Sequence, residues 1–279
     1  MYWEHERETI QEILSRSKEP YYRFEPYYKR SNGEPSWQWD FLLHANSYGR
    51  VALGANRIGK SEMGAYECVL AILGEHPIRK YPDEGIGWII GLDNNMLRDV
   101  DRPIFERYIP EWVKAKSKYY KQDNLWVIET DKRFWRINFK STEMEIGKFA
   151  GAKIDFAWVD EEPKRIEIFA EIEARLVDKG GNWWMTATPM RGTKWLKELS
   201  ERTSVYSTFA GMRENPYLPE EFVEQFASQL SDEERDVRVE GKYIIWGGKP
   251  IFNRNKLQEM SDRIQAESMG IQGILKLVA

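Results

Sequence analysis

From Ser36 onward, short apolar runs alternate along the chain with longer stretches in which apolar residues recur every three or four positions. Short apolar runs are typical of buried strands, and the longer recurrence is typical of helices that cover a sheet. Strands are predicted at 50–54, 86–92, 154–162 and 182–189, and helices at 60–74, 97–110 and 165–177. This alternation predicts an α/β fold with a mostly parallel central sheet flanked by helices.

The flanking segments follow other patterns. Two apolar runs, at 124–130 and 133–140, predict a β-hairpin. After Pro189, the stretches 218–230 and 231–241 predict two short helices, opened by Pro219 and Ser231. We interpret these two helices as a small helical lid. A further amphipathic helix is predicted at 4–17, within a charged and aromatic N-terminal extension at 1–35.

The amino-acid composition excludes only a few classes of function. The net charge of −4 argues against a chain that is basic over its whole surface, but it leaves room for a local basic face. Twelve tryptophans predict a heavily packed core, and the single cysteine excludes an internal disulfide. The longest apolar run, around Cys68–Leu73, is too short for a membrane span, so we expect no membrane association.

The clearest chemical signal lies between the strand at 50–54 and the helix at 60–74. It matches G-x-x-x-x-G-K-[ST], in which glycines let backbone N–H groups point at phosphate oxygens. Lys60 is expected to bridge the β- and γ-phosphates of ATP, and Ser61 to hold Mg²⁺. The alternative is a glycine-rich surface turn. The predicted nucleotide-binding loop comprises Gly54, Ala55, Asn56, Arg57, Ile58, Gly59, Lys60 and Ser61.

Two more strands end in polar residues. Asp160 and Glu161 follow a run of four apolar residues, so they are predicted at the carboxyl end of the sheet, where ligands bind in open α/β sheets. Asp160 would coordinate the metal, mostly through water, and Glu161 would act as the general base toward the attacking water. The alternative is a helix N-terminus that carries acidic residues.

The second of these strands ends in Thr186, Ala187 and Thr188. Hydroxyl groups at the same edge could sense the γ-phosphate or its water and couple hydrolysis to the lid. The alternative is a strand that ends in a proline turn.

The order of these three motifs resembles the large terminase subunit of tailed bacteriophages. Members of that family package double-stranded DNA into a procapsid with an N-terminal ATPase and cut it with a C-terminal nuclease. The stretches 35–61, 139–163, 214–226 and 234–243 also resemble the family. The resemblance implies a P-loop NTPase core of the ASCE/RecA-like type at 36–200, a lid at 201–246, and a linker at 247–279 toward a nuclease domain that is absent, so no nuclease activity is expected.

The resemblance also implies roles for particular residues. Gln38 is the candidate for contact with adenine, and Arg57 could reach the γ-phosphate from within the same subunit, where it would stabilise developing charge. Many relatives carry an arginine shortly before the acidic motif that acts on the neighbouring subunit. This chain has Lys148 there instead, so Lys148, Arg98 and Arg102 are the candidates for a trans-acting residue.

The partners implied are double-stranded DNA, a portal protein, a small terminase subunit and further copies of the chain in a ring, in the cytoplasm of the host cell. An isolated domain could be a monomer. Two rival functions remain open: a helicase-like or other DNA-translocating ATPase, and a regulatory module that binds nucleotide but hydrolyses little. Fewer than a hundred residues follow Pro189, too few for the second RecA-like domain of a helicase. The pair Asp160–Glu161 argues against a passive binder.

Overall fold

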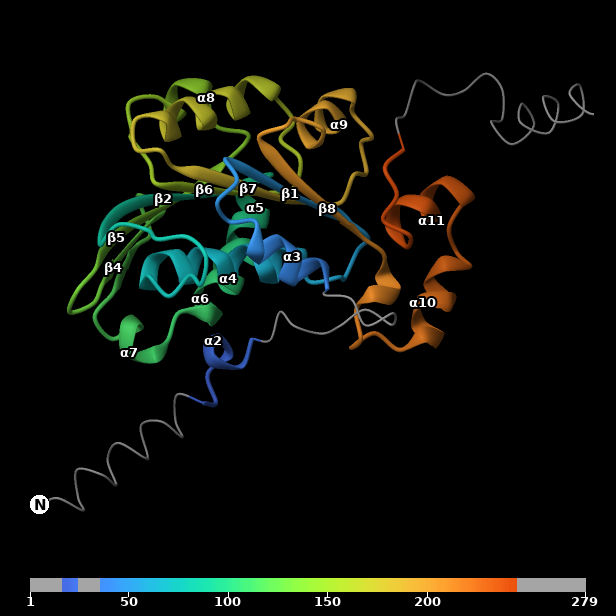
Figure 1. Cartoon of the computed structure of the whole chain (residues 1–279), viewed down its shortest axis with the longest axis horizontal. Helices are drawn as coiled ribbons and strands as arrows, with labels where there is room; N and C mark the ends of the chain where they lie inside the picture. The colour runs from blue at the N-terminus through green and yellow to red at the C-terminus, as the bar shows by residue number, and fades with distance from the viewer. Residues whose placement is uncertain (1–16, 25–35, 245–279) are drawn as a thin grey trace, which may run out of the picture. The chain divides into compact units, whose positions relative to one another are not determined.

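An eight-stranded sheet organises the part of the chain that the computed structural model describes, residues 17–24 and 36–244 (Figure 1). Its strands lie in the order β3-β4-β5-β2-β6-β7-β1-β8. All neighbours from β5 to β8 are parallel, whereas β4 is antiparallel to both β3 and β5. The strands are β1 (Gly49–Gly54), β2 (Glu84–Gly91), β3 (Lys118–Tyr120), β4 (Leu125–Glu129), β5 (Phe134–Ser141), β6 (Phe156–Asp160), β7 (Asn182–Ala187) and β8 (Val205–Ala210). The predicted mostly parallel sheet and the predicted hairpin are confirmed.

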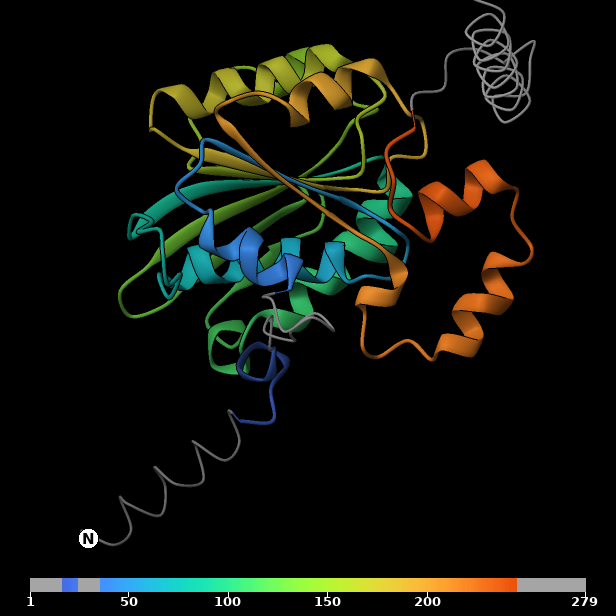
Figure 2. The ribbon, with the colours of Figure 1, turned by 45° about the vertical axis from the view of Figure 1, so that its right-hand side comes forward.

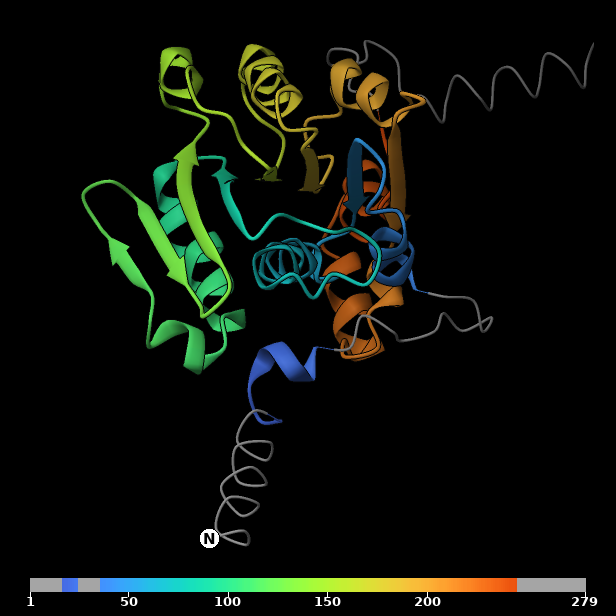
Figure 3. The ribbon, with the colours of Figure 1, turned by 60° about the vertical axis from the view of Figure 1, so that its left-hand side comes forward.

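Helices cover both faces of this sheet (Figure 3). On one face lie α3 (Trp37–Leu43), α4 (Lys60–Leu73) and α6 (Arg102–Tyr108), and on the other α8 (Ile166–Val177) and α9 (Lys194–Ser200). The two lid helices, α10 (Glu220–Ala227) and α11 (Asp232–Arg238), stand beside one end of the sheet (Figure 2). The shorter elements are α2 (Pro20–Arg23), α5 (Asn94–Met96), the π-helix η1 (Leu97–Asp101), α7 (Glu111–Lys114), and the 3₁₀ turns η2 (Ile146–Phe149) and η3 (Met212–Glu214).

Side chains of the central strands alternate between two separate cores, as the period of a strand requires. Ala52, Ile89, Trp158 and Trp184 pack with α3, α4 and α6 in one core. Their sequence neighbours enter the second core, with α8 and α9: Val51, Leu53, Trp88, Ile90, Ala157, Val159, Trp183 and Met185. Because both faces are covered, these strands read as continuous apolar runs rather than as alternating ones.

A glycine sets how closely α4 approaches the sheet. A Cβ on Gly64 would lie 2.3 Å from Nε1 of Trp158, and the carbonyl of Gly64 accepts a hydrogen bond of 3.1 Å from Nε1 of Trp184. No larger residue fits against the two indoles without movement of the helix. This contact therefore fixes the height of the start of α4 above the ends of β6 and β7.

A buried ion pair joins the elements around β1. Arg50 in β1 contacts Glu67 in α4 at 2.5 Å and donates to the carbonyl of Phe41 in α3 at 2.9 Å. Glu67 also lies 2.9 Å from Nε2 of His76, whose Nδ1 accepts two backbone N–H groups. Nε2 is therefore the ring nitrogen that donates, toward the carboxylate of Glu67. Burial would raise the pKa of Glu67, but Arg50 and His76 outweigh it and lower the pKa to about 2.

The N-terminal extension contacts the rest of the protein through aromatic residues. Phe24 stacks on Tyr66 with ring centres 4.2 Å apart and meets Tyr108 edge-on. Tyr21 is buried and donates to Glu75 at 2.6 Å. Residues Pro20–Arg23 thus pack against α4 and α6. The helix predicted at 4–17 lies outside the described residues, apart from its last residue.

Three features differ from the sequence-based expectation. The helix predicted at 97–110 begins at Asn94 and contains a π turn before Pro103, which has no N–H to donate to the carbonyl of Asp99. Val205–Ala210 lies in the range expected for the lid, 201–246, but forms β8, parallel to β1. The sheet therefore extends beyond the expected end of the core at residue 200, and we propose that the lid starts at Gly211. The strand β3 and the helix α9 were not predicted.

Replacement of Gly64 by alanine should destabilise the protein, although alanine favours helices. The added methyl group must displace the indole of Trp158, and overpacking of this kind costs about 1–3 kcal/mol. The urea unfolding midpoint measures the effect. Gly147→Ala is the matched control, since a Cβ there meets nothing within 4 Å, and should change stability by less than about 0.5 kcal/mol. Equal midpoints for the two variants would show that the close approach of α4 is not a constraint.

Candidate active site

The loop between β1 and α4 has the curled backbone that a phosphate cradle needs. Arg57 and Gly59 both adopt left-handed conformations, with φ of 63° and 83°. Lys60 is buried, and its Nζ donates to the carbonyls of Gly54 at 3.1 Å and Ala55 at 2.6 Å. Burial lowers the pKa of Lys60, while the charges of Glu161 and Asp160 act in the opposite direction. The loop's own carbonyls therefore hold the ammonium group in this structure.

Asp160 connects the three sequence motifs. It is fully buried at the tip of β6, and its carboxylate accepts from Oγ of Ser61 at 2.8 Å and from Oγ1 of Thr186 at 2.5 Å. Nε1 of Trp158 in turn donates to Oγ1 of Thr186 at 2.7 Å. Burial raises the pKa of Asp160, and the hydrogen bonds work against this rise. A single carboxylate thus holds the start of α4 and the end of β7 together.

Glu161 lies beside this group in an unusual backbone conformation, with φ of 67°. Its Oε2 accepts from the backbone N–H of Thr188 at 3.0 Å, and Oγ1 of Thr188 lies 3.2 Å from Oδ1 of Asn56. Burial, and then the charge of Asp160, raise the pKa of Glu161 to about 7. A carboxylate with a pKa near neutrality is suited to accept a proton from water.

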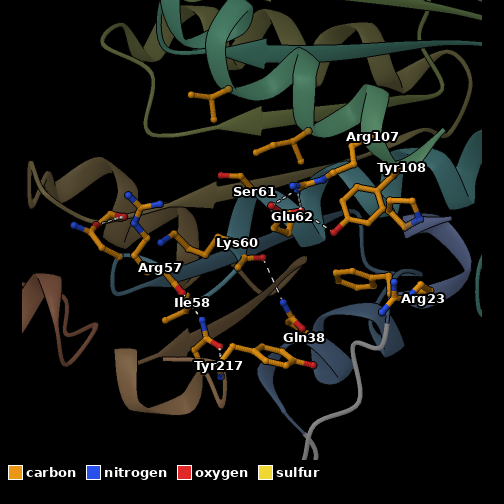
Figure 4. Close-up of a pocket in the computed structure, with 18 of the residues that line it drawn as sticks. Arg23, Gln38, Arg57, Ile58, Lys60, Ser61, Glu62, Arg107, Tyr108 and Tyr217 are labelled. Atoms are coloured by element: carbon orange, nitrogen blue, oxygen red, sulfur yellow. Dashed lines mark hydrogen bonds and ion pairs between the residues drawn. The ribbon is translucent and has the colours of Figure 1, made fainter. Parts of the chain in front are cut away.

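Lys60, Ser61 and Glu161 line a pocket of about 830 Å³, which is large enough for a nucleoside triphosphate (Figure 4). Figure 4 shows Arg57 on one side of the pocket and Arg23 and Arg107 on the other. Gln38 forms part of the wall, and its Nε2 donates to the carbonyl of Gly59 at 3.3 Å. The predicted residues that line the pocket are Gln38, Asn56, Arg57, Ile58, Gly59, Lys60, Ser61, Glu161 and Thr188.

Other predicted residues lie elsewhere. Ala187 is buried in the core on the α8 side of the sheet. Arg98 pairs with its exposed neighbour Asp99 at 2.7 Å, and Arg102 pairs with Glu106 at 3.2 Å. The carbonyl of Lys148 accepts from Lys140 at 2.7 Å, while its side chain is exposed. Lys148, Arg98 and Arg102 do not line the pocket of their own subunit, so a trans-acting role for any of them stays a prediction.

The sequence reasoning missed part of the pocket. Arg107 and Tyr108 on α6 both contact Glu62, and Tyr108 donates to it at 2.6 Å. These pairs join residues more than forty positions apart, so no local pattern reveals them. The further pocket residues are Lys18, Pro20, Arg23, Phe24, Glu62, Val100, Ile104, Arg107, Tyr108, Asn215 and Tyr217.

A second missed residue is Asp101, which is fully buried at the end of η1. Its carboxyl group lies within hydrogen-bonding reach of that of Asp160. Burial, and then the charge of Asp160, raise the pKa of Asp101 to about 10. A lone aspartate within a charged helical stretch gives no sequence signal of such a position.

The lid contacts the phosphate loop directly. Nδ2 of Asn215 donates to the carbonyl of Arg57 at 2.6 Å, and the backbone N–H of Asn56 donates to the carbonyl of Arg238 at 3.0 Å. Arg213 braces the lid itself through ion pairs with Glu220, Glu224 and Glu240. A change in the loop's backbone therefore has to alter contacts with both ends of the lid.

The residues present fit a magnesium ion that is shared with phosphates. A hydroxyl group and a carboxylate, Ser61 and Asp160, already contact each other, and Mg²⁺ prefers such oxygen ligands together with water. Within the described ranges, no three His, Cys, Asp or Glu side chains gather into a group that could hold a metal alone.

Comparison with known proteins agrees with this geometry. The family model described as terminase large subunit, T4likevirus-type, N-terminal, matches residues 51–259, about three quarters of the chain. The chain belongs to this family. No curated protein matches the sequence.

Solved structures of terminases share the fold at low sequence identity. The large terminase of the thermophilic bacteriophage D6E superposes with a TM-score of 0.63 at 16% identity, over 80% of this chain and 57% of that one. The ATPase domain of the Thermus phage P74-26 large terminase gives 0.63 at 16%, over 79% and 95%. The HK97 large terminase gives 0.56 at 13%, over 81% and 55%. The chain thus spans little more than half of the longer terminases.

The fold is that of a P-loop NTPase of the ASCE/RecA-like type, as expected from the sequence. Solved D6E structures include complexes with ADP and with ATP-gamma-S. No helix within residues 17–24 and 36–244 is long and apolar enough to cross a membrane.

Proposed function

We propose that this chain is the ATPase motor domain of a viral large terminase, which hydrolyses ATP to drive double-stranded DNA into a procapsid. The observation that carries the proposal is the meeting of Ser61, Thr186 and Glu161 around Asp160, where Ser61 and Glu161 also line the pocket formed by the phosphate loop. A passive nucleotide-binding module has no need of a buried carboxylate with a pKa near 7 beside its phosphates.

Each residue of the site has a separate task in this account. The loop's N–H groups and Lys60 bind the phosphates, and Lys60 must leave the carbonyls of Gly54 and Ala55 to do so. Ser61 and Asp160 hold Mg²⁺, which supplies charge neutralisation on the phosphate oxygens. Glu161 accepts a proton from the attacking water at its carboxylate, and Gln38 in the pocket wall would contact adenine.

Hydrolysis would reach the lid through a chain of contacts that starts at Glu161. Glu161 holds the N–H of Thr188, Thr188 contacts Asn56, and Asn56 donates to Arg238 of the lid. Loss of the γ-phosphate would rearrange Asn56 and with it the bond to the lid. The proposed coupling group is therefore Thr188 together with Thr186, whereas Ala187 fills the core between them.

The partners follow from the family and stay proposals. A packaging motor acts on double-stranded DNA, docks on a portal protein, works with a small terminase subunit and assembles as a ring of identical subunits, here in the cytoplasm of the host. A trans-acting residue, for which Lys148, Arg98 and Arg102 are candidates, would complete the neighbouring site in such a ring.

Two substitutions should separate binding from chemistry. Lys60→Ala removes a charge beside the β- and γ-phosphates, so both ATP binding and hydrolysis should be lost. Glu161→Gln keeps Asp160 and Ser61, so ATP and Mg²⁺ should still bind while the single-turnover rate falls about a hundredfold or more. The measurements are ATP binding by fluorescence and single-turnover hydrolysis, with and without DNA. Hydrolysis at the unmodified rate in Lys60→Ala would contradict the proposed function.

Arg57 should act on chemistry more than on binding. Its side chain is exposed at the pocket and has no hydrogen-bond or ion-pair partner among the described residues, so it is free to meet a γ-phosphate. Arg57→Ala should lower the single-turnover rate about a thousandfold and leave ADP affinity within about twofold. Arg57→Lys should restore only part of the rate, because lysine lacks the planar guanidinium.

Mixing two inactive variants distinguishes a residue that acts within its own subunit from one that acts on the neighbouring subunit. If Arg57 acts within its own subunit, an equimolar mixture of Arg57→Ala and Glu161→Gln chains gains no activity. Recovery on mixing would assign Arg57 to the neighbouring site, and an unchanged single-turnover rate in Arg57→Ala would remove it from the mechanism.

A further inference from the structure

Asp101 is a buried acid that the proposed mechanism does not use. Its side chain is fully buried at the end of the π-helix η1, and neither carboxylate oxygen accepts a hydrogen bond from a donor in the described parts of the chain. It faces another carboxyl group, that of Asp160, within hydrogen-bonding reach. The two acids belong to different elements, η1 and β6. They meet because β2, which precedes η1 in the chain, lies next to β6 in the sheet.

Two local irregularities bring Asp101 to this place. The π turn Leu97–Asp101 widens the helix immediately before α6, and such turns occur frequently at functional sites. Gly91, the last residue of β2, leaves room for the carboxylate, since a Cβ there would lie 2.2 Å from Oδ2 of Asp101.

Asp101 and Asp160 cannot both stay ionised in this buried space without a proton or a cation between them. A carboxylate removed from water without a donor is strongly unfavourable, and a second carboxylate beside it makes the arrangement worse. Lys60 interacts with Asp160 and Glu161, but its Nζ donates to the carbonyls of Gly54 and Ala55. A proton shared by the two carboxyl groups satisfies them in this structure, as the raised pKa of Asp101 indicates, and a cation at the Ser61–Asp160 pair would satisfy both acids in its place.

We propose that Asp101 is a positioning residue of the magnesium site, where it fixes the orientation of Asp160 and accepts hydrogen bonds from water on the cation. This inference rests on the proposed function, because the cation arrives with ATP. Mg²⁺ keeps several of its waters in proteins, and these waters need acceptors around the site. Carboxylates behind the direct ligands commonly set metal affinity by orienting those ligands.

The test is a direct measurement of metal binding with the full chain. Mn²⁺ serves as the probe, and its dissociation constant is measured by electron paramagnetic resonance at saturating ADP. Asp101→Asn keeps the size of the side chain but removes its charge, and should raise the Mn²⁺ dissociation constant about 10- to 100-fold. ADP affinity in the absence of metal should stay within about twofold, because Asp101 does not line the pocket.

Asp99→Asn is the matched control. Asp99 lies two residues earlier on the same helix, where it is exposed and paired with Arg98, so its loss should leave the Mn²⁺ dissociation constant unchanged. If Asp101→Asn fails to fold, as judged by circular dichroism and thermal unfolding, Asp101→Ser provides the same comparison.

Two results would overturn the inference. An unchanged Mn²⁺ dissociation constant in folded Asp101→Asn would show that Asp101 takes no part in metal binding. An equal loss of metal-free ADP affinity would show that it only supports the shape of the pocket. Failure of the unmodified chain to bind Mn²⁺ with ADP is a different outcome, which would overturn the proposed function and this inference with it.

Discussion

The carboxylate of Asp160 is the point on which the site depends, because it hydrogen-bonds to the first turn of α4 and the last residues of β7 at once. That meeting requires the start of α4 to lie close to the ends of two strands. Gly64 permits the approach by exposing backbone to the indoles of Trp158 and Trp184. Packing about one helical turn beyond Lys60 and Ser61 thus sets the geometry of the chemistry.

Electrostatics explains why the site should bind a charged ligand. Asp160, Glu161 and Asp101 lie in a buried space, where burial raises the pKa of each and the charge of Asp160 raises those of Glu161 and Asp101 further. Lys60 offsets part of this charge while its ammonium group rests on loop carbonyls. The cation that accompanies a nucleotide supplies positive charge to the acids, and the phosphates draw Lys60 away from the loop carbonyls. Nucleotide binding and rearrangement of the loop are therefore coupled.

Much of this arrangement could be predicted from the sequence, because its signals are local. The loop Gly54–Ser61 sits between an apolar run and a helical pattern, and buried parallel strands bring Asp160 and Thr186 to one edge. Contacts between distant segments could not be predicted in this way: Arg107 meets Glu62, and Asp101 meets Asp160, across tens of residues. The strand β8 was not predicted because half of its residues are only partly buried, which weakens the apolar pattern in the sequence.

A crystal structure of the chain with Mg²⁺ and a non-hydrolysable ATP analogue tests the central claim most directly. The account predicts that Nζ of Lys60 leaves the carbonyls of Gly54 and Ala55 for the phosphates, and that the cation lies about 2.1 Å from Oγ of Ser61. Asp160 should then face the water shell of the cation instead of the serine hydroxyl. A nucleotide bound elsewhere, or one bound here while the Ser61–Asp160 and Lys60 contacts stay as they are, would contradict the account.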